Sequence, residues 1–256
     1  MRVLLSNDDG VEAPGLAVLE AIARRFTDDV WVVAPAEEQS GTGRSLTLTR
    51  PVRLRQLGER RWAVTGTPTD AVMMALAEVM KDARPDLVLS GVNRGANLAE
   101  DVHYSGTVAA AAEAALAGIP AVALSQIYPE AGMGDRVTYE AAEAWGERVL
   151  APLVARIGGW TPRTLVNVNF PPVQPDAVRG VRVVRQGLRD YGRLKLDKRS
   201  DPRGFPYYWL ALGRLPLTPA ADTDLEASEQ GFVTVTPLHL DATHDPSLAT
   251  LAAAFA

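Results

Sequence analysis

The sequence predicts an α/β protein built on a doubly wound, mostly parallel sheet with a C-terminal β-rich extension. Over the first two-thirds of the 256 residues, short apolar runs alternate with stretches whose apolar residues recur at helical spacing. Loops rich in glycine and asparagine follow several of these runs, as in parallel sheets that bind ligands. The alternation is lost after residue 177, where polar loops join β-like segments. We therefore expect a core at residues 1–177 and an extension at residues 178–256.

The composition is that of a globular protein and excludes several kinds of site. Hydrophobic residues make up 47% of the chain, which is enough for a sizeable core. There is no cysteine, which rules out disulfides, thiolate catalysis and cysteine-bound metals. A net charge of −5 offers no general attraction for nucleic-acid polymers. The apolar runs are too short to span a membrane, and the chain opens directly on a strand pattern. We therefore expect a cytoplasmic protein that binds neither membranes nor nucleic-acid polymers.

The N-terminal elements are read from apolar runs and from the residues that stop them. A first strand is expected at Val3–Ser6, followed by a loop at Asn7–Pro14. Apolar residues at helical spacing then predict a helix that runs to about Phe26. A second strand is expected at Val30–Ala34, because Pro35 would stop it.

Later elements follow the same logic. They are two antiparallel-looking segments at Leu46–Leu54 and Arg61–Val64, a helix from Pro68 to about Lys81, a strand at Asp86–Ser90, an alanine-rich helix opened by Tyr104–Thr107 and ending at Gly118, a strand at Ala121–Ser125, a helix near Val137–Ile157 and a strand at Thr164–Asn169. Thr67 is a plausible N-cap with Pro68 at the first helical position, and Gly118 suits a helix C-terminus.

The extension contains β-like segments at Gly180–Gln186, Phe205–Leu212 and Gly231–Thr236, and a short helix at residues 246–256. Large aromatic residues gather between Phe205 and Trp209, where no neighbouring helix is evident to cover them. Such residues are typical anchors of subunit contacts, although an aromatic strand packed on its own core is an equally good interpretation.

Four polar loops are expected at one edge of the sheet, because the carboxyl ends of parallel strands share an edge. These loops contain Asn7-Asp8-Asp9-Gly10, Gln39-Ser40-Gly41-Thr42-Gly43-Arg44, Gly91-Val92-Asn93-Arg94-Gly95-Ala96-Asn97 and Ser105-Gly106-Thr107. Each alone reads as a surface turn or a helix cap. Their coincidence at one edge favours a binding site.

The acidic pair Asp8 and Asp9 predicts a divalent metal site. Past the end of a strand, a turn assisted by glycine aims both carboxylates at one point, and their repulsion favours a cation between them. Ser40 and Asn93 offer neutral oxygens from neighbouring strand ends. The three histidines lack zinc-protease spacing, so we expect an oxygen-ligand site for a hard cation such as Mg²⁺ or Mn²⁺.

The motif Ser105-Gly106-Thr107 is a candidate phosphate site. A helix entrance supplies N–H groups and the positive end of the helix dipole. Arg44 and Arg94 are candidates for neutralising phosphate charge, although surface arginines are usually solvated. His103 is interpreted as a loop residue that flanks the site.

These residues together resemble one known family. The matching motifs are Ser6-Asn7-Asp8-Asp9-Gly10 with Ala13-Pro14-Gly15, Val33-Ala34-Pro35, Ser40-Gly41, Gly66-Thr67-Pro68, Ser90-Gly91-Val92-Asn93-Arg94-Gly95, Tyr104-Ser105-Gly106-Thr107 and Thr236-Pro237-Leu238. They resemble the SurE survival-protein family over nearly the whole chain and in the right order. Arg44 departs from the pattern, since many relatives have asparagine there.

The resemblance implies a Rossmann-like core, a C-terminal arm used in homodimers or homotetramers, and a cytoplasmic location. It implies a metal-dependent nucleotidase that hydrolyses nucleoside 5′- and 3′-monophosphates with a metal-activated water. One Mg²⁺ or Mn²⁺ per subunit would be bound by Asp8, Asp9, Ser40 and Asn93, with Asp8 and Asp9 as catalytic residues. Substrate contacts are expected from Asn7, Ser40, Gly41, Asn93, Ser105, Gly106 and Thr107.

Other α/β enzymes with acids after the first strand fit less well. A haloacid-dehalogenase-type phosphatase needs a nucleophilic aspartate two residues before a second aspartate, and Asn7 stands at that position before Asp9. A receiver domain needs an aspartate at the end of the third strand, where Ser90-Gly91 stands. A dinucleotide-binding enzyme needs the pattern Gly-x-Gly-x-x-Gly after the first strand, where this chain has Asp8-Asp9-Gly10-Val11. A non-catalytic nucleotide sensor stays open.

Overall fold

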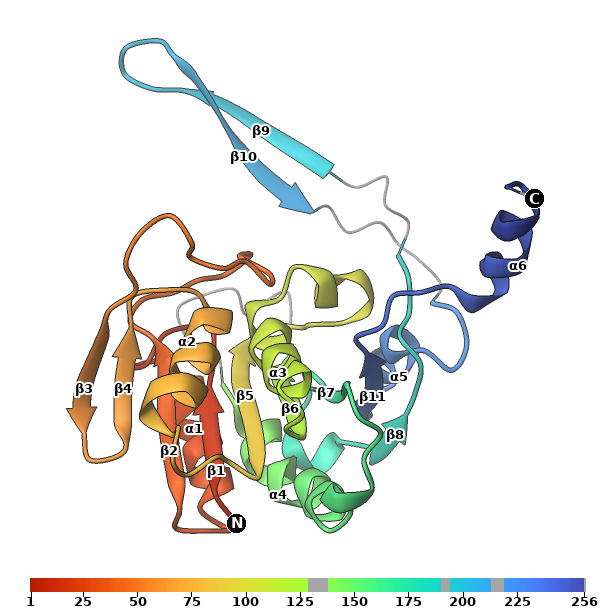
Figure 1. Ribbon diagram of the computed structural model, residues 1–256. Helices are drawn as coiled ribbons and strands as arrows, with labels where there is room; N and C mark the ends of the chain where they lie inside the picture. Colours follow the sequence, from red (N-terminus) through yellow and green to blue (C-terminus); the bar gives the residue numbers. More distant parts are fainter. Residues whose placement is uncertain (129–137, 190–193, 213–218, 256) are drawn as a thin grey trace.

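The computed structural model describes residues 1–128, 138–189, 194–212 and 219–255 (Figure 1). A nine-stranded sheet in the order β3-β4-β2-β1-β5-β6-β7-β11-β8 forms the centre of these residues. Its strands are β1 Val3–Ser6, β2 Val30–Pro35, β3 Leu54–Gly58, β4 Arg61–Val64, β5 Leu87–Arg94, β6 Ala121–Gln126, β7 Thr164–Phe170, β8 Val181–Val183 and β11 Val233–His239. A separate antiparallel hairpin consists of β9 Leu194–Ser200 and β10 Pro206–Leu212.

The sheet confirms the predicted α/β class with mostly parallel strands. Strands β4, β2, β1, β5, β6 and β7 all run parallel. Strand β3 is antiparallel to β4, and β11 is antiparallel to β7. The carboxyl ends of the six parallel strands therefore lie at one edge.

Helices cover both faces of the sheet (Figure 1). They are α1 Pro14–Ala23, α2 Pro68–Met74, α3 Gly106–Leu116, α4 Glu140–Val154, α5 Asp224–Glu229 and α6 Asp245–Ala253. Val3 and Leu5 of β1 pack in one apolar core with residues of α1 and α4. Leu4 packs in a second core with residues of α2 and α3. Successive side chains of a strand point to opposite faces, so β1 is buried on both.

The predicted helix ends are confirmed at two caps. The hydroxyl of Thr67 accepts a hydrogen bond from the N–H of Asp70, whose carboxylate accepts one from the N–H of Thr67, and Pro68 is the first residue of α2. Gly118, just beyond α3, has φ of 79°, which glycine adopts without strain. Helix α2 is shorter than predicted, because a π-helical turn at Ala75–Val79 follows it.

Several predicted boundaries are wrong. Helix α1 ends at Ala23 rather than near Phe26. The segment Leu46–Leu54 is not a strand; β3 begins only at Leu54, which pairs with Val64 of β4. Strand β5 continues past Ser90 because its last residues pair with β6 beyond a bulge. Helix α4 spans only residues 140–154, and position 137 of the predicted helix lies outside the described residues.

The C-terminal part divides between the sheet and two projecting elements. Strands β8 and β11 extend the nine-stranded sheet, and α5 lies between the hairpin and β11 in the sequence. Strand β9 and helix α5 have no counterpart among the predicted elements, and β8 is shorter than predicted. Figure 1 shows the β9–β10 hairpin and α6 extending away from the sheet, and α6 has no buried residue. Within the described ranges, no helix combines the length and apolar character that a membrane crossing requires.

Candidate active site at the ends of β1 and β5

The predicted site residues follow strands at the point where the strand order changes direction. Strand β1 lies between β2 and β5, so successive strands extend the sheet on either side of it. Asp8 and Asp9 follow β1, and Asn93 is near the end of β5. Ligands of open α/β sheets bind in the crevice at such a switch point.

Asp8 is the most deeply buried acid of the predicted site, with 4% of its surface exposed. Its Oδ1 accepts a hydrogen bond from the hydroxyl of Thr107 in the first turn of α3. Burial raises the pKa of Asp8 to about 7; the Thr107 hydrogen bond opposes this shift, and the charge of Asp9 adds to it. A positive group beside Asp8 would therefore relieve a large electrostatic cost.

Asp9 lies next to it and is half-buried. Its Oδ2 accepts a hydrogen bond of 3.1 Å from the backbone N–H of Arg94, which ties the end of β1 to the end of β5. Burial raises the pKa of Asp9, the hydrogen bond from Arg94 lowers it, and the charge of Glu38 raises it. Among the described residues neither acid forms an ion pair, and the charge of Arg94 only partly offsets the raised pKa of Asp9.

The loop after β2 lies against this acidic pair. The N–H of Gln39 donates to the carbonyl of Asp8 at 2.8 Å, and the N–H of Gly43 donates to the carbonyl of Tyr104 at 3.1 Å. Ser40 is exposed, and its hydroxyl donates to Glu38 Oε1 at 2.9 Å. Ser40 therefore lies in the loop that contacts the acidic pair, with its hydroxyl turned to Glu38.

The N-terminus of α3 completes the edge of the site. The Ser105 hydroxyl accepts a hydrogen bond of 3.0 Å from the N–H of Val108, so Ser105 is the N-cap and keeps its own O–H as a donor. The Thr107 hydroxyl is used by Asp8. The first N–H groups of a helix have no partner inside the helix, so those of Gly106 and Thr107 suit an anion.

Gly106 allows α3 to approach Asp8 closely. A Cβ at this position would lie 2.7 Å from the Cβ of Asp8 and 3.0 Å from Cγ of Pro68. The first is shorter than side-chain contacts allow. The glycine in Ser105-Gly106-Thr107 thus has a steric role at this site.

Two asparagine amides at the site have their NH₂ groups fixed. Asn7 Nδ2 donates to the carbonyl of Gly10 at 2.8 Å, and Asn93 Nδ2 donates to that of Gly95 at 3.0 Å. The amide oxygen of Asn7 is buried and accepts no hydrogen bond from the described residues. The amide oxygens are thus left to serve as acceptors or ligands.

The donor set fits a hard divalent cation. Two carboxylates, an amide oxygen and a hydroxyl are the ligands that Mg²⁺ and Mn²⁺ prefer. No group of three or more histidine, cysteine, aspartate or glutamate side chains converges in the described part of the chain, so a nitrogen- or sulfur-rich site is not formed there. The raised pKa of buried Asp8 has the same implication, since a bound cation would stabilise its carboxylate.

Three of the predicted side chains are exposed to solvent, and other residues near the acids were missed. Arg44, Arg94 and His103 are exposed. Glu38 was missed, although its place two residues before Ser40 is a usable signal. Tyr139 was also missed; burial and then the charge of Asp9 raise the pKa of its phenol to about 12. Nothing in the sequence links Tyr139 to Asp9.

The chain is similar to known proteins over its full length. A family profile described as "Survival protein SurE" matches residues 3–193. A protein named 5′-nucleotidase SurE from Rhizorhabdus wittichii is 64% identical over 255 residues, which cover 100% of both chains. Its namesake from Erythrobacter litoralis is 55% identical over 255 residues, again 100% of both chains. The crystal structure of the SurE protein from Aquifex aeolicus matches with a TM-score of 0.82 and 35% identity over 100% of both chains.

Proposed function

The chain belongs to the SurE family and is a 5′-nucleotidase, and we propose that it requires one divalent cation per subunit, Mg²⁺ or Mn²⁺. The proposed ligands are Asp8, Asp9, Ser40 and Asn93. The proposed substrates are nucleoside 5′-monophosphates and also 3′-monophosphates. The observation that carries the proposal is the buried Asp8 carboxylate, which lies beside Asp9 and against the N-terminus of α3.

Hydrolysis of the ester transfers a phosphoryl group to water and releases the nucleoside. When bound, the cation would neutralise charge on the phosphoryl oxygens and lower the pKa of a water molecule. Thr107 holds Asp8 through its hydroxyl, and the N–H of Arg94 holds Asp9. These contacts orient the two carboxylates before any ligand arrives, which reduces the reorganisation that the reaction needs.

The phosphoryl group is proposed to bind at the start of α3. Gly106 and Thr107 present backbone N–H groups there, and Ser105 presents one hydroxyl donor, at the positive end of the helix dipole. Further contacts are proposed for Asn7, Ser40, Gly41 and Asn93. The buried amide oxygen of Asn7 lacks a partner in the described chain, and as an acceptor it suits a donor group of the substrate rather than a phosphoryl oxygen.

Phosphate release from nucleoside monophosphates tests the function. We expect release from 5′- and 3′-monophosphates in Mn²⁺ or Mg²⁺, and none after chelation with EDTA. Full activity of EDTA-treated protein would contradict the metal proposal while leaving the nucleotidase activity intact. Nucleotide binding without phosphate release in any divalent metal would instead favour a nucleotide sensor.

We also propose that residues 178–256 serve assembly into a homodimer or homotetramer. Strand β11 and α5 supply residues to the core, whereas the β9–β10 hairpin exposes large apolar side chains. Leu196, Phe205, Tyr208, Trp209 and Leu210 are each more than half exposed. A second copy of the chain would cover them, since exposed patches of this kind mark protein contacts. The division at residue 177 and the cytoplasmic location stay predictions.

A further inference from the structure

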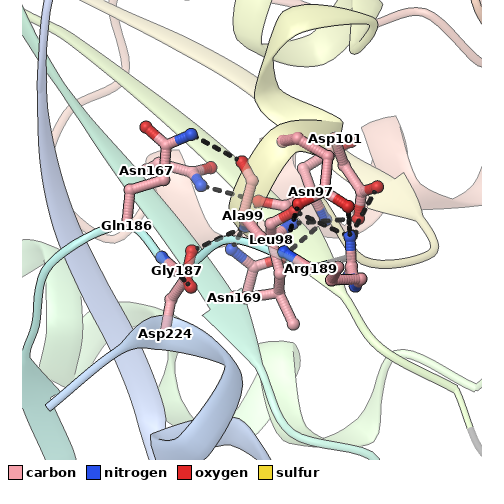
Figure 2. Close-up of polar contacts among 11 residues, drawn as sticks. Asn97, Leu98, Ala99, Asp101, Asn167, Asn169, Gln186, Gly187, Arg189 and Asp224 are labelled. Atoms are coloured by element: carbon pink, nitrogen blue, oxygen red, sulfur yellow. Dashed lines mark hydrogen bonds and ion pairs between the residues drawn. The ribbon is translucent and has the colours of Figure 1, made fainter. Parts of the chain in front are cut away.

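Residues 97–101 lead into the Ser105–Thr107 motif and are held by polar side chains from remote parts of the chain (Figure 2). The N–H of Asn97 donates to Asn169 Oδ1 at 2.8 Å, and its carbonyl accepts from Asn167 Nδ2 at 2.7 Å. The Asn97 amide also donates to the hydroxyl of Ser125 at 2.8 Å. Strands β6 and β7 thereby fix the start of the segment.

The middle of the segment is held from the other side. Ala99 has φ of 53°, a left-handed conformation that costs a residue with a side chain about 1 kcal/mol. Its N–H donates to Asp224 Oδ2 at 2.9 Å, and its carbonyl accepts from Gln186 Nε2 at 2.9 Å. Asp224 Oδ1 also accepts from the N–H of Gly187 at 2.8 Å, so one buried carboxylate joins both segments.

Arg189 holds the end of the segment with a paired contact. Its Nη1 and Nη2 donate to the two carboxylate oxygens of Asp101 at 2.8 and 3.0 Å. The same Nη1 lies 3.3 Å from Glu100 Oε1 and from the carbonyl of Leu98. The side chains of this ion-pair cluster are only about a fifth to a quarter exposed, with 22% for Arg189 and 25% for Asp101. A two-pronged, shielded pair of this kind fixes orientation as well as distance.

The backbone of Asp101 is in turn part of the phosphate-site scaffold. Its carbonyl accepts hydrogen bonds of 3.0 Å from the N–H groups of Tyr104 and Ser105. Ser105 caps α3, and Thr107 bonds to Asp8. A continuous series of contacts therefore runs from Arg189 through Asp101 to the start of α3.

We propose that Arg189 is a positioning residue for the hydrolysis, which acts through Asp101 to hold the N-terminus of α3 at the distance from Asp8 that phosphate binding requires. The inference rests on the proposed phosphate-binding role of Ser105–Thr107. Among the described residues, the polar contacts of Arg189 are to Leu98, Glu100 and Asp101 and to none of the proposed metal ligands. Its loss should therefore weaken phosphate binding and slow turnover while the affinity of the metal site is kept.

The test compares Arg189→Met, Arg189→Lys and the control Arg25→Met, which removes an ion pair to Glu147 on the surface. The melting temperature of each variant is measured first. The kcat, the KM and the affinities for inorganic phosphate and for Mn²⁺ are then measured below the melting range. We expect Arg189→Met to lose about 10- to 100-fold in kcat and in phosphate affinity, because a small misplacement of binding groups is costly. Mn²⁺ affinity should change less than about twofold. Arg189→Lys should be intermediate, because lysine keeps the charge without the planar fork.

A variant that melts earlier but has normal kcat and phosphate affinity would overturn the proposal, since Arg189 would then be only structural. An equal loss of phosphate and Mn²⁺ affinity would also overturn it. If Arg189→Met does not fold, Arg189→Lys and Asp101→Asn provide the same comparison. Wild-type protein that hydrolyses nucleotides but does not bind inorganic phosphate, with Ser105→Ala unchanged, would place the failure in the proposed phosphate site instead.

Discussion

The hydroxyl of Thr107 donates a hydrogen bond to Oδ1 of Asp8, which joins the first turn of α3 to the end of β1 across 99 residues of sequence. The contact places a buried carboxylate at the positive end of a helix. It also leaves the second oxygen of Asp8 for another partner. Metal and phosphate are therefore expected to bind side by side, and the predictions below separate the two.

The metal site is tested by removing one carboxylate at a time. Asp8→Asn and Asp9→Asn should each lower kcat by about 1,000-fold or more, because a ligand charge is lost while the shape is kept. The control is Asp82→Asn, which changes an exposed aspartate on the surface and should leave kcat unchanged. Phosphate release with titrated Mn²⁺ measures the effect. Near-normal rates in either site variant would contradict the assignment.

The pKa of Asp8 predicts how the stability of metal-free protein depends on pH. Its folded pKa of about 7 exceeds the ordinary 3.8, so the folded state holds the proton more tightly than the unfolded state. The resulting stabilisation is present at low pH and is lost as the pH rises to 7. In EDTA at pH 8, Asp8→Asn should therefore have a higher free energy of unfolding than wild type, by about 1.4 kcal/mol for each pKa unit of the shift, and a higher melting temperature.

Two further melts check the cause of that difference. The difference in stability between Asp8→Asn and wild type should become smaller at pH 5, where wild-type Asp8 is protonated in the folded state. Saturating Mn²⁺ should reverse the order, because only wild type gains the full binding energy. Equal melting of both proteins at pH 8 in EDTA would show that the buried charge is not costly.

Gly106 is predicted to be intolerant of a side chain. Gly106→Ala would place a Cβ 2.7 Å from Cβ of Asp8, so α3 or Asp8 must move. We expect kcat to fall about 100-fold and the free energy of unfolding to fall by about 1–3 kcal/mol. Gly158→Ala is a matched control, because a Cβ there meets no atom within 4 Å. Equal kinetics of the two variants would argue against close packing of α3 on the acid.

Ser105 is predicted to combine two roles. Ser105→Ala should lose about 1 kcal/mol of stability with the helix cap. Affinity for inorganic phosphate and for vanadate should fall together by about tenfold, because a hydrogen bond to a charged group is lost. Ser105→Thr keeps the hydroxyl and should retain most of both properties. Unchanged affinity for both anions in Ser105→Ala would reduce the motif to a helix cap.

Assembly is predicted to depend on the β9–β10 hairpin. Light scattering should give the mass of a dimer or tetramer for wild type. Trp209→Ser should lower that mass or weaken association, because large aromatic residues are common anchors of interfaces. Leu48→Ser removes another exposed apolar side chain, 83% exposed and outside the extension, and should leave the mass unchanged. A wild-type monomer at micromolar concentration would refute the assembly proposal.

The fold was predictable wherever local pattern and tertiary pairing agree. Strands β1, β2 and β7 begin where the apolar runs begin, and Thr67 and Gly118 bound helices as their residue types predict. The sequence pattern did not predict elements whose position depends on tertiary contacts or whose length is too short to show a period. Strand β3 is an edge strand set by its antiparallel partner β4, and α5 has six residues, too few to show a helical period.

The sequence by itself determined which loops meet, because parallel strands bring their carboxyl ends to one edge and each loop carries its residues there. Only the tertiary structure decided which atoms touch. Thr107 reaches Asp8, and Arg189 pairs with Asp101 from 88 positions away. Such contacts depend on how helices and loops pack over the sheet, and neither periodicity nor spacing along the chain carries that information.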